Sequence, residues 1–216
     1  EQIVPEDVFL ETEESDPENL FENYTAGLFD YSGYDETINR IIDGILHQRK
    51  CLVSYYSIYE RVNKNFYVEP RRIVYFRGGL YVIIYIRRFE KFRLLAIQRI
   101  KHFEVLEEVH PDEPRFDPAL FWKNKFGLFS ADSCHVKIEF STSARMHIEG
   151  RHWHPSQVFS EGKKGSLILE MDVGISPELT SWIFSWNEYA KVLEPPELIE
   201  KISKKIDKLK KLYPTT

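Results

Sequence analysis

Residues 68–86 read VEPRRIVYFRGGLYVIIYI, two runs rich in β-branched and aromatic residues that are separated by Arg77-Gly78-Gly79. Such runs favour strands, and a short break containing glycine is typical of a hairpin turn. Comparable runs lie nearby, so the predicted strands are Cys51–Ser57, Phe66–Phe76, Leu80–Ile86, Phe92–Ile97 and Lys101–Leu106. Five short strands separated by polar breaks predict a small SH3/Sm-like β-barrel rather than an α/β layer fold.

The segment before these strands has the periodicity of a helix. Over residues 34–47, four isoleucines recur at i, i+3, i+4 and i+7, on one face of an amphipathic helix: Ile38, Ile41, Ile42 and Ile45. Asp35 is a candidate N-cap for this helix. No glycine-rich phosphate loop follows any predicted strand, which argues against a nucleotide-hydrolysing or dinucleotide-binding fold.

A second unit is predicted beyond a proline-rich linker, because residues 110–118 contain three prolines. The residues that follow predict strands at 136–141, 158–161, 166–173 and 190–193, and helices at 143–150, 176–186 and 196–213. Pro177 is expected at the first position of its helix. The overall class is therefore α+β, with an acidic leader at 1–33, the barrel and its helix at 34–109, a linker at 110–134 and a compact α+β domain at 135–216.

The closing helix at 196–213 is rich in lysine and carries an aliphatic stripe. We expect this stripe to belong to the core and the lysines to form a solvated face. The stripe consists of Leu198, Ile202, Ile206 and Leu209.

Composition excludes several classes of protein. The chain has 216 residues, of which 43% are hydrophobic and 29% charged, so it can bury a core. Its longest apolar run, residues 80–86, is far shorter than the roughly twenty residues of a membrane span. Residues 1–7 do not resemble a signal peptide, and two cysteines are too few for a disulfide framework. We therefore expect a cytoplasmic protein without a membrane partner.

Charge is strongly segregated along the chain. Residues 1–39 hold twelve acidic side chains and no basic one, whereas residues 40–108 hold fourteen basic and seven acidic side chains. The formal net charge of -5 conceals this division. Since local fields attract ligands, the basic central segment predicts an anionic partner.

The central segment combines arginines with tyrosines. Arginine makes planar, bidentate contacts with phosphate and aromatic rings stack on bases, so the mixture suits short single-stranded nucleic acid or a nucleotide. Strand alternation places Arg93 on an otherwise apolar face, where a buried charge needs a partner. Arg93 is therefore the first candidate and Arg99 the next. Arg71 and Arg72 point to opposite faces, so at most one of them is expected in the site.

A structural role for the same residues is the alternative. In that interpretation Tyr75, Tyr81 and Tyr85 belong to the core, and Arg87-Arg88 is a solvated turn. Glu69, Glu90 and Glu104 are expected to pair with nearby arginines.

Catalytic and metal chemistry have little support in the sequence. His147, His152 and His154 lie close together but match no metal-ligand spacing. There is no nucleophile with a base and an orienting group. We expect no enzyme activity, no metal and no cofactor.

Several motifs occur in the order found in a known family. Residues 53–57 read VSYYS, 68–75 VEPRRIVY, 78–83 GGLYVI and 93–100 RLLAIQRI. This set resembles the WYL domain of bacterial transcriptional regulators, with residues 80–82 standing where the Trp-Tyr-Leu lies. Leu80 and Val82 replace Trp and Leu, Gln98 replaces the usual Asp, and Ala96 stands where many members have Arg. Residues 151–157, 182–186 and 192–198 resemble the WCX extension that follows many WYL domains.

The resemblance implies an effector-sensing and dimerising portion of a regulator. It implies that Tyr55 and an arginine near Arg71 share a pocket, and that the protein is a homodimer. Double-stranded DNA is expected to bind only through an N-terminal winged helix-turn-helix, which residues 1–33 are too short and too acidic to form. The candidate ligand-binding set is Tyr55, Arg71, Arg72, Tyr81, Arg93 and Arg99.

A second hypothesis has no transcriptional role. The chain would then be an accessory single-stranded nucleic-acid-binding or protein-interaction module. Its acidic leader would act as a nucleic-acid mimic that occupies the basic barrel.

Overall fold

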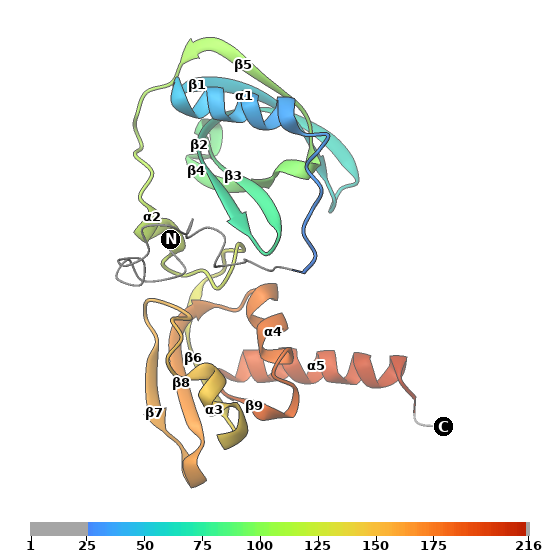
Figure 1. Cartoon of the computed structure of the whole chain (residues 1–216), viewed down its shortest axis with the longest axis vertical. Coiled ribbons are helices and arrows are strands. Elements are labelled where there is room, and N and C mark those ends of the chain that lie inside the picture. Colours follow the sequence, from blue (N-terminus) through green and yellow to red (C-terminus); the bar gives the residue numbers. More distant parts are fainter. Residues whose placement is uncertain (1–25, 215–216) are drawn as a thin grey trace, which may run out of the picture. The chain divides into compact units, whose positions relative to one another are not determined.

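The computed structural model describes residues 26–214, and the chain divides into two compact units between Pro114 and Arg115 (Figure 1). Each unit has an antiparallel sheet and its own core, which confirms the α+β class. Most of the expected leader lies outside the described residues. Within residues 26–214, no helix is both long and apolar enough to cross a membrane.

The N-terminal unit begins with α1 (Asp35–Leu46) and continues with five strands in the order β4-β3-β2-β1-β5. Two short 3-10 helices, η3 (Arg87–Phe89) and η4 (Ile97–Arg99), flank β4. The strands are β1 (Arg49–Ser57), β2 (Val62–Phe76), β3 (Gly79–Ile86), β4 (Lys91–Ala96) and β5 (Ile100–Val109).

The sheet is open rather than a closed barrel, because the edge strands β4 and β5 form no ladder with each other among the described residues. It bends within the long strand β2. The first half of β2 pairs with β1 up to Val68, and the second half pairs with β3 from Glu69 onward. The register shifts between Pro70 and Arg72, so Arg71 is the extra residue of a β-bulge.

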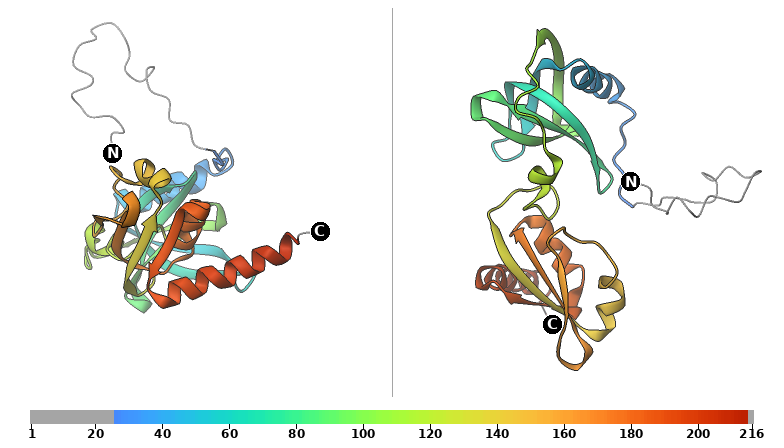
Figure 2. Two further views of the ribbon diagram at one scale, coloured as in Figure 1. Left: turned by 90° about the horizontal axis from the view of Figure 1, so that it is seen from below. Right: turned by 90° about the vertical axis from the view of Figure 1, so that its left-hand side faces the viewer.

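Helix α1 packs closely on the sheet (Figure 2). Ile41 is fully buried in the core with Cys51 and Phe103. A Cβ on Gly44 would lie 2.8 Å from the Sγ of Cys51, so only glycine permits this approach. The expectation that Asp35 is the N-cap is wrong: the cap residue is Tyr34, and Asp35 opens the first turn. There its carboxylate still favours the positive end of the helix dipole.

The β2–β3 hairpin forms at the predicted position. Arg77 and Gly78 both have positive φ, 46° and 80°, as a two-residue hairpin turn of type I′ requires. A Cβ on Gly78 would lie 2.7 Å from the carbonyl oxygen of Gly27. Glycine is thus required both by the turn and by the chain segment that packs on it.

The C-terminal unit builds a four-stranded sheet in the order β7-β8-β6-β9. A short helix, α2 (Pro118–Trp122), lies within the region expected to be a linker. Trp153, Trp182 and Trp186 pack in the core of this unit. Its other elements are β6 (Ser133–Phe140), α3 (Thr142–Ile148), β7 (Val158–Glu161), η5 (Lys163–Gly165), β8 (Leu167–Gly174), α4 (Pro177–Phe184), η6 (Asn187–Tyr189), β9 (Ala190–Glu194) and α5 (Pro196–Leu212).

Helix α4 begins as its sequence predicts. Pro177 occupies the first turn, and the Oγ of Ser176 accepts a hydrogen bond from the backbone N–H of Leu179 at 3.0 Å. Ser176 is itself buried. The cap therefore satisfies a helix N–H that would otherwise be buried without a partner.

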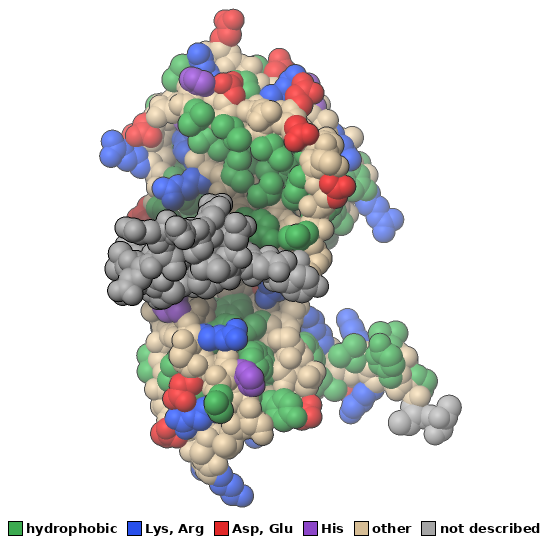
Figure 3. Space-filling model, viewed as in Figure 1, with side chains coloured by type: hydrophobic (Ala, Val, Ile, Leu, Met, Phe, Trp, Pro, Cys, Tyr) green, Lys and Arg blue, Asp and Glu red, His purple; other side chains and the backbone are tan. Residues whose placement is uncertain are grey.

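Helix α5 corrects the expectation that its whole aliphatic stripe is core. Leu198 is fully buried and Ile202 packs against the core, but Ile206 and Leu209 are 40% and 44% exposed. The helix extends beyond the sheet of its unit (Figure 1). Ile206 and Leu209 follow Lys205, which still donates to the Oγ1 of Thr180 in α4 at 3.1 Å. Apolar side chains lie beside lysines along this end (Figure 3).

Candidate ligand-binding site

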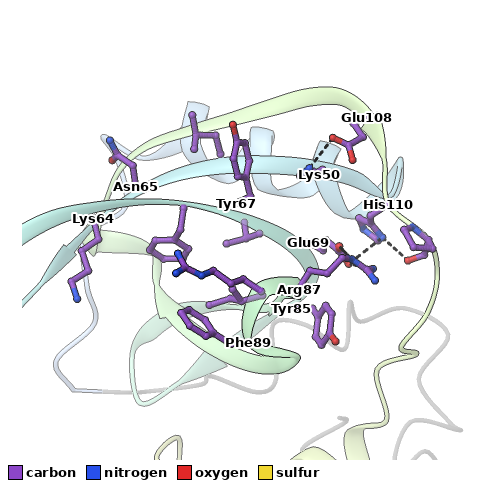
Figure 4. A pocket seen from close by; sticks show the side chains of 16 residues that line it. Lys50, Lys64, Asn65, Tyr67, Glu69, Tyr85, Arg87, Phe89, Glu108 and His110 are labelled. Carbon is purple, nitrogen blue, oxygen red and sulfur yellow. Dashed lines mark hydrogen bonds and ion pairs between the residues drawn. The ribbon is translucent and has the colours of Figure 1, made fainter.

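The N-terminal unit contains a cavity of about 1150 Å³ that is lined by β1, β2, β3, η3 and the end of β5 (Figure 4). Aromatic rings form much of its wall: Phe66, Tyr67, Tyr85 and Phe89. Four cations and two carboxylates also line it: Lys50, Lys64, Arg87, Arg88, Glu69 and Glu108. The cavity therefore combines flat apolar surfaces with an excess of positive charge.

A buried carboxylate is held by two arginines at one end of the cavity. The side chain of Glu69 is 5% exposed. Its Oε1 accepts a hydrogen bond from the Nε of Arg87 at 2.6 Å, and its Oε2 accepts one from the Nη2 of Arg71 at 3.0 Å. A buried charge is tolerated only with such partners. The expectation that Glu69 pairs with nearby arginines is confirmed.

The β-bulge places Arg71 between Glu69 and His110. The Nη1 of Arg71 donates to the Nε2 of His110 at 2.8 Å, which assigns the ring proton to Nδ1. That Nδ1 donates in turn to the carbonyl oxygen of Pro111 at 2.9 Å. The Nε of Arg71 is buried and has no hydrogen-bond partner in the described part of the chain. Arg71 thus keeps one buried donor unsatisfied, behind the residues that line the cavity.

The network also changes the titration of Glu69. Burial by itself raises the pKa of this carboxyl group, but hydrogen bonds from Arg87 and Arg71 outweigh burial and hold the pKa below its ordinary value. Glu69 is therefore ionised at neutral pH. The carboxylate offsets part of the positive charge of the cavity and fixes both guanidinium groups.

The rest of the lining includes a cation that is not neutralised. Within residues 26–214 no carboxylate pairs with Arg88, whose guanidinium lies 5.6 Å from the ring centroid of Phe89. Lys64 forms an exposed ion pair with Glu60 at 2.5 Å. Exposed pairs of this kind contribute little energy, so Lys64 can exchange its partner for a ligand anion.

Three of the sequence-predicted residues form a different cluster. The Nε and Nη2 of Arg99 donate to the carbonyl oxygen of Tyr56 at 3.0 and 2.8 Å, and the guanidinium lies 4.5 Å from the ring centroid of Tyr55. The hydroxyl oxygen of Tyr55 accepts from the backbone N–H of Ala96 at 3.2 Å. Tyr81 is the ladder partner of Ala96. These contacts tie η4 and β4 to β1.

Two family models match the chain, one for the WYL domain over residues 36–105 and one for the WCX domain over residues 132–209. Together they cover more than half of the sequence. The chain contains a WYL domain followed by a WCX domain. The resemblance drawn from the ordered motifs is therefore confirmed, and the cavity lies in and just beyond the matched WYL region.

One solved structure supports the same fold at low sequence identity. A structure titled as a CRISPR Cas-related protein shares 13% identity with a TM-score of 0.57, covering 83% of this chain and 52% of its own. Proteasome accessory factor B/C of Arthrobacter aurescens shares 18% identity with a TM-score of 0.40, covering 88% of this chain and 29% of its own. The chain thus spans at most about half the length of these proteins. No curated protein sequence matches it.

The remaining predicted residues lie on the surface of the WYL domain. Arg93 is exposed near the start of the edge strand β4, although Leu95 and Ile97 on the same face are buried. The premise that Arg93 carries a buried charge is therefore wrong, because the core ends before its position. Arg72 is also exposed. None of the six predicted residues lines the cavity. Arg71 alone contacts lining residues, Glu69 and His110, and a ligand role for all six stays a prediction.

Sequence reasoning missed most of the cavity. The sequence predicts Phe66 only as part of a strand, Phe89 after a turn and His110 in the linker. One sequence feature could have indicated the cavity. Arg87-Arg88 stands next to Phe89, which makes an arginine–aromatic cluster directly after the hairpin.

Proposed function

We propose that this chain is the effector-sensing portion of a bacterial transcriptional regulator and that its effector is an anionic, nucleic-acid-like ligand. The cavity of the WYL domain carries the proposal. Its volume of about 1150 Å³ suits a nucleotide or a short oligonucleotide segment. Rings such as Phe66 and Phe89 offer stacking surfaces for bases, and Arg88 offers an unneutralised guanidinium for a phosphate.

The network around Glu69 supports a specific role for this end of the cavity. Arg87 lines the cavity and is held in a fixed orientation by the carboxylate, so a ligand phosphate meets a donor that is already positioned. In this proposal Arg88 and Lys64 neutralise the backbone of the ligand. The WCX domain would then pass the bound state to a DNA-binding head.

Fluorescently labelled single-stranded oligonucleotides test the proposal, by anisotropy titration of the full chain across a salt series. Phosphate contacts predict an affinity that falls as salt rises. Arg88→Glu is expected to weaken binding at least tenfold. Lys101→Glu is the matched control, since Lys101 is exposed on the same domain but does not line the cavity.

Other outcomes would change the proposed position of the effector site or the proposed class of effector. Loss of binding in Arg93→Glu but not in Arg88→Glu would move the site to the surface of β4, as the sequence predicts. Absence of binding at every salt concentration would exclude an oligonucleotide effector. The homodimer implied by the resemblance stays a prediction that sedimentation equilibrium checks.

A further inference from the structure

The chain leaves the WYL domain through a short segment that is held by the wall of the cavity. Residues 111–114 lie just after β5 and end at the boundary between the two units, and we refer to them as the exit segment. The Nδ1 of His110 donates to the carbonyl oxygen of Pro111 at 2.9 Å, and the Nη2 of Arg87 donates to that of Glu113 at 3.0 Å. Both donating side chains line the cavity. The exit segment is therefore attached to the same wall that the effector would meet.

The contacts of Arg87 leave no complete edge of its guanidinium for a phosphate. Its Nε and Nη2 donate to the two carboxylate oxygens of Glu69 at 2.6 and 3.0 Å, and Nη2 also donates to the carbonyl oxygen of Glu113. Both hydrogens of Nη2 are therefore in use. A phosphate binds a guanidinium best through two parallel N–H groups. Since Glu69 occupies one edge, the other edge, formed by Nη1 and Nη2, is complete only when the carbonyl of Glu113 leaves.

The carbonyl of Glu113 is the acceptor that a phosphate can replace. It is neutral, whereas Glu69 is charged and its side chain is only 5% exposed. A phosphate carries a full negative charge, so it attracts the guanidinium more strongly than a peptide carbonyl does. The side chain of Arg87 is 51% exposed, so a ligand can reach it. A phosphate is thus expected to displace the carbonyl of Glu113 and to leave the pair with Glu69 in place.

We propose that the effector and the exit segment compete for Arg87, so that a phosphate held by Nη1 and Nη2 releases the carbonyl of Glu113. This competition rests on the effector cavity proposed above. The backbone N–H of His110 donates to the carbonyl oxygen of Gln48 at 2.9 Å, a contact that does not involve Arg87. Release is therefore limited to the exit segment. Because the chain continues from there into the C-terminal unit, an occupied cavity gives this connection more freedom.

A spin label on the exit segment tests the competition by electron paramagnetic resonance of the full chain. Glu113 is exposed, so Glu113→Cys accepts a nitroxide while the backbone carbonyl is kept. Cys134→Ser is made in the same chain, and Cys51 is fully buried and stays unlabelled. The probe is a single-stranded oligonucleotide with a terminal phosphate, and anisotropy measures its binding under the same conditions. One net hydrogen bond shifts an equilibrium roughly fivefold, so the ratio of mobile to immobile label should rise by that factor at saturation.

Substitution of Arg87 tests the attachment without any ligand. Arg87→Ala removes the donor, so the ratio of mobile to immobile label should already be roughly fivefold higher and should not respond to the oligonucleotide. Arg87→Lys keeps a cation beside Glu69 but lacks the paired N–H groups, and it should give the same result. Arg93→Ala is the matched control, because Arg93 is exposed on β4 and does not line the cavity. It should leave the label immobile, and hydrogen exchange of β1 and β5 peptides checks that each variant folds.

The outcomes separate the competition from the effector site itself. Mobility that rises on binding in the parent chain and is already high in both Arg87 variants supports the competition. Oligonucleotide binding that leaves the label immobile would refute the competition and keep the effector site. An immobile label in both Arg87 variants would mean that this hydrogen bond does not hold the exit segment, which also refutes it. Absence of binding at every salt concentration would remove the effector proposal and the competition with it.

Discussion

Removal of the buried charge of Glu69 should destabilise the WYL domain far more than removal of an exposed charge. Glu69→Gln keeps the shape and one acceptor oxygen but leaves Arg71, whose side chain is 9% exposed, without a carboxylate. Losing one partner of a buried pair costs about 3–5 kcal/mol. Arg87 is 51% exposed and can be solvated, so its contribution is small. We therefore expect a loss near the lower limit, about 3 kcal/mol.

Urea unfolding of the full chain measures this loss with separate probes for the two units. All four tryptophans, at 122, 153, 182 and 186, lie in the C-terminal unit, so their fluorescence follows that unit. Hydrogen exchange of peptides from β1 and β5 follows the WYL domain. Glu60→Gln is the control, because the Glu60–Lys64 pair is 49% and 45% exposed. A loss for Glu69→Gln below about 1 kcal/mol, equal to the control, would refute the role of the network.

The pH dependence of the same difference provides an independent check. The pKa of Glu69 is held below its ordinary value, chiefly because hydrogen bonds from Arg87 and Arg71 outweigh burial. A depressed carboxyl pKa contributes stability that is present above the unfolded pKa and lost as pH falls through the folded pKa. The wild-type advantage over Glu69→Gln should therefore be constant near neutral pH and shrink only below about pH 4.

Three further predictions concern local features. His135 contacts Asp172 and Glu170 at 3.0 Å, and these hydrogen bonds raise its pKa. These contacts should stabilise the C-terminal unit by a few tenths of a kcal/mol at this exposed site. That stability should be present below about pH 6.5 and lost at higher pH. Tryptophan fluorescence should show that it is absent in His135→Asn. Ser176→Ala should cost about 1–2 kcal/mol in the same assay by removing the α4 cap, and no loss would exclude that role. Gly78→Ala should destabilise the WYL domain by about 1 kcal/mol or more because φ is positive at this position. Gly33→Ala is the control, since an added Cβ there has no neighbour within 4 Å. Hydrogen exchange should show no loss of stability for the control.

Local patterns predicted the elements of the fold well. The isoleucine period gave α1, the Arg77-Gly78-Gly79 break gave the β2–β3 hairpin, and Pro177 marked the start of α4. These features depend on neighbours in sequence, so the residues themselves specify them. The closed barrel was not confirmed, because closure depends on pairing between β4 and β5, which no local pattern encodes.

The cavity was predictable only in part, for a physical reason. Its lining combines β2, the turn after β3 and His110, which the bend of one strand brings together. The bulge at Arg71 directs that side chain to Glu69 and His110, and a single extra residue in a ladder leaves no periodic signal. The prediction that Arg93 carries a buried charge is wrong, because alternation along a strand shows which face a residue lies on but not where the core ends.

The close packing of α1 on β1 makes Cys51 a natural chemical probe of opening of the WYL domain. The thiol of Cys51 is fully buried beneath Gly44, and burial raises its pKa to about 12. A thiol in that state does not react with alkylating reagents until the helix lifts away. The rate at which Cys51 is alkylated therefore reports how often the WYL domain opens, and no engineered label is needed. Effector binding in the cavity should slow that rate by the same factor by which it stabilises the domain.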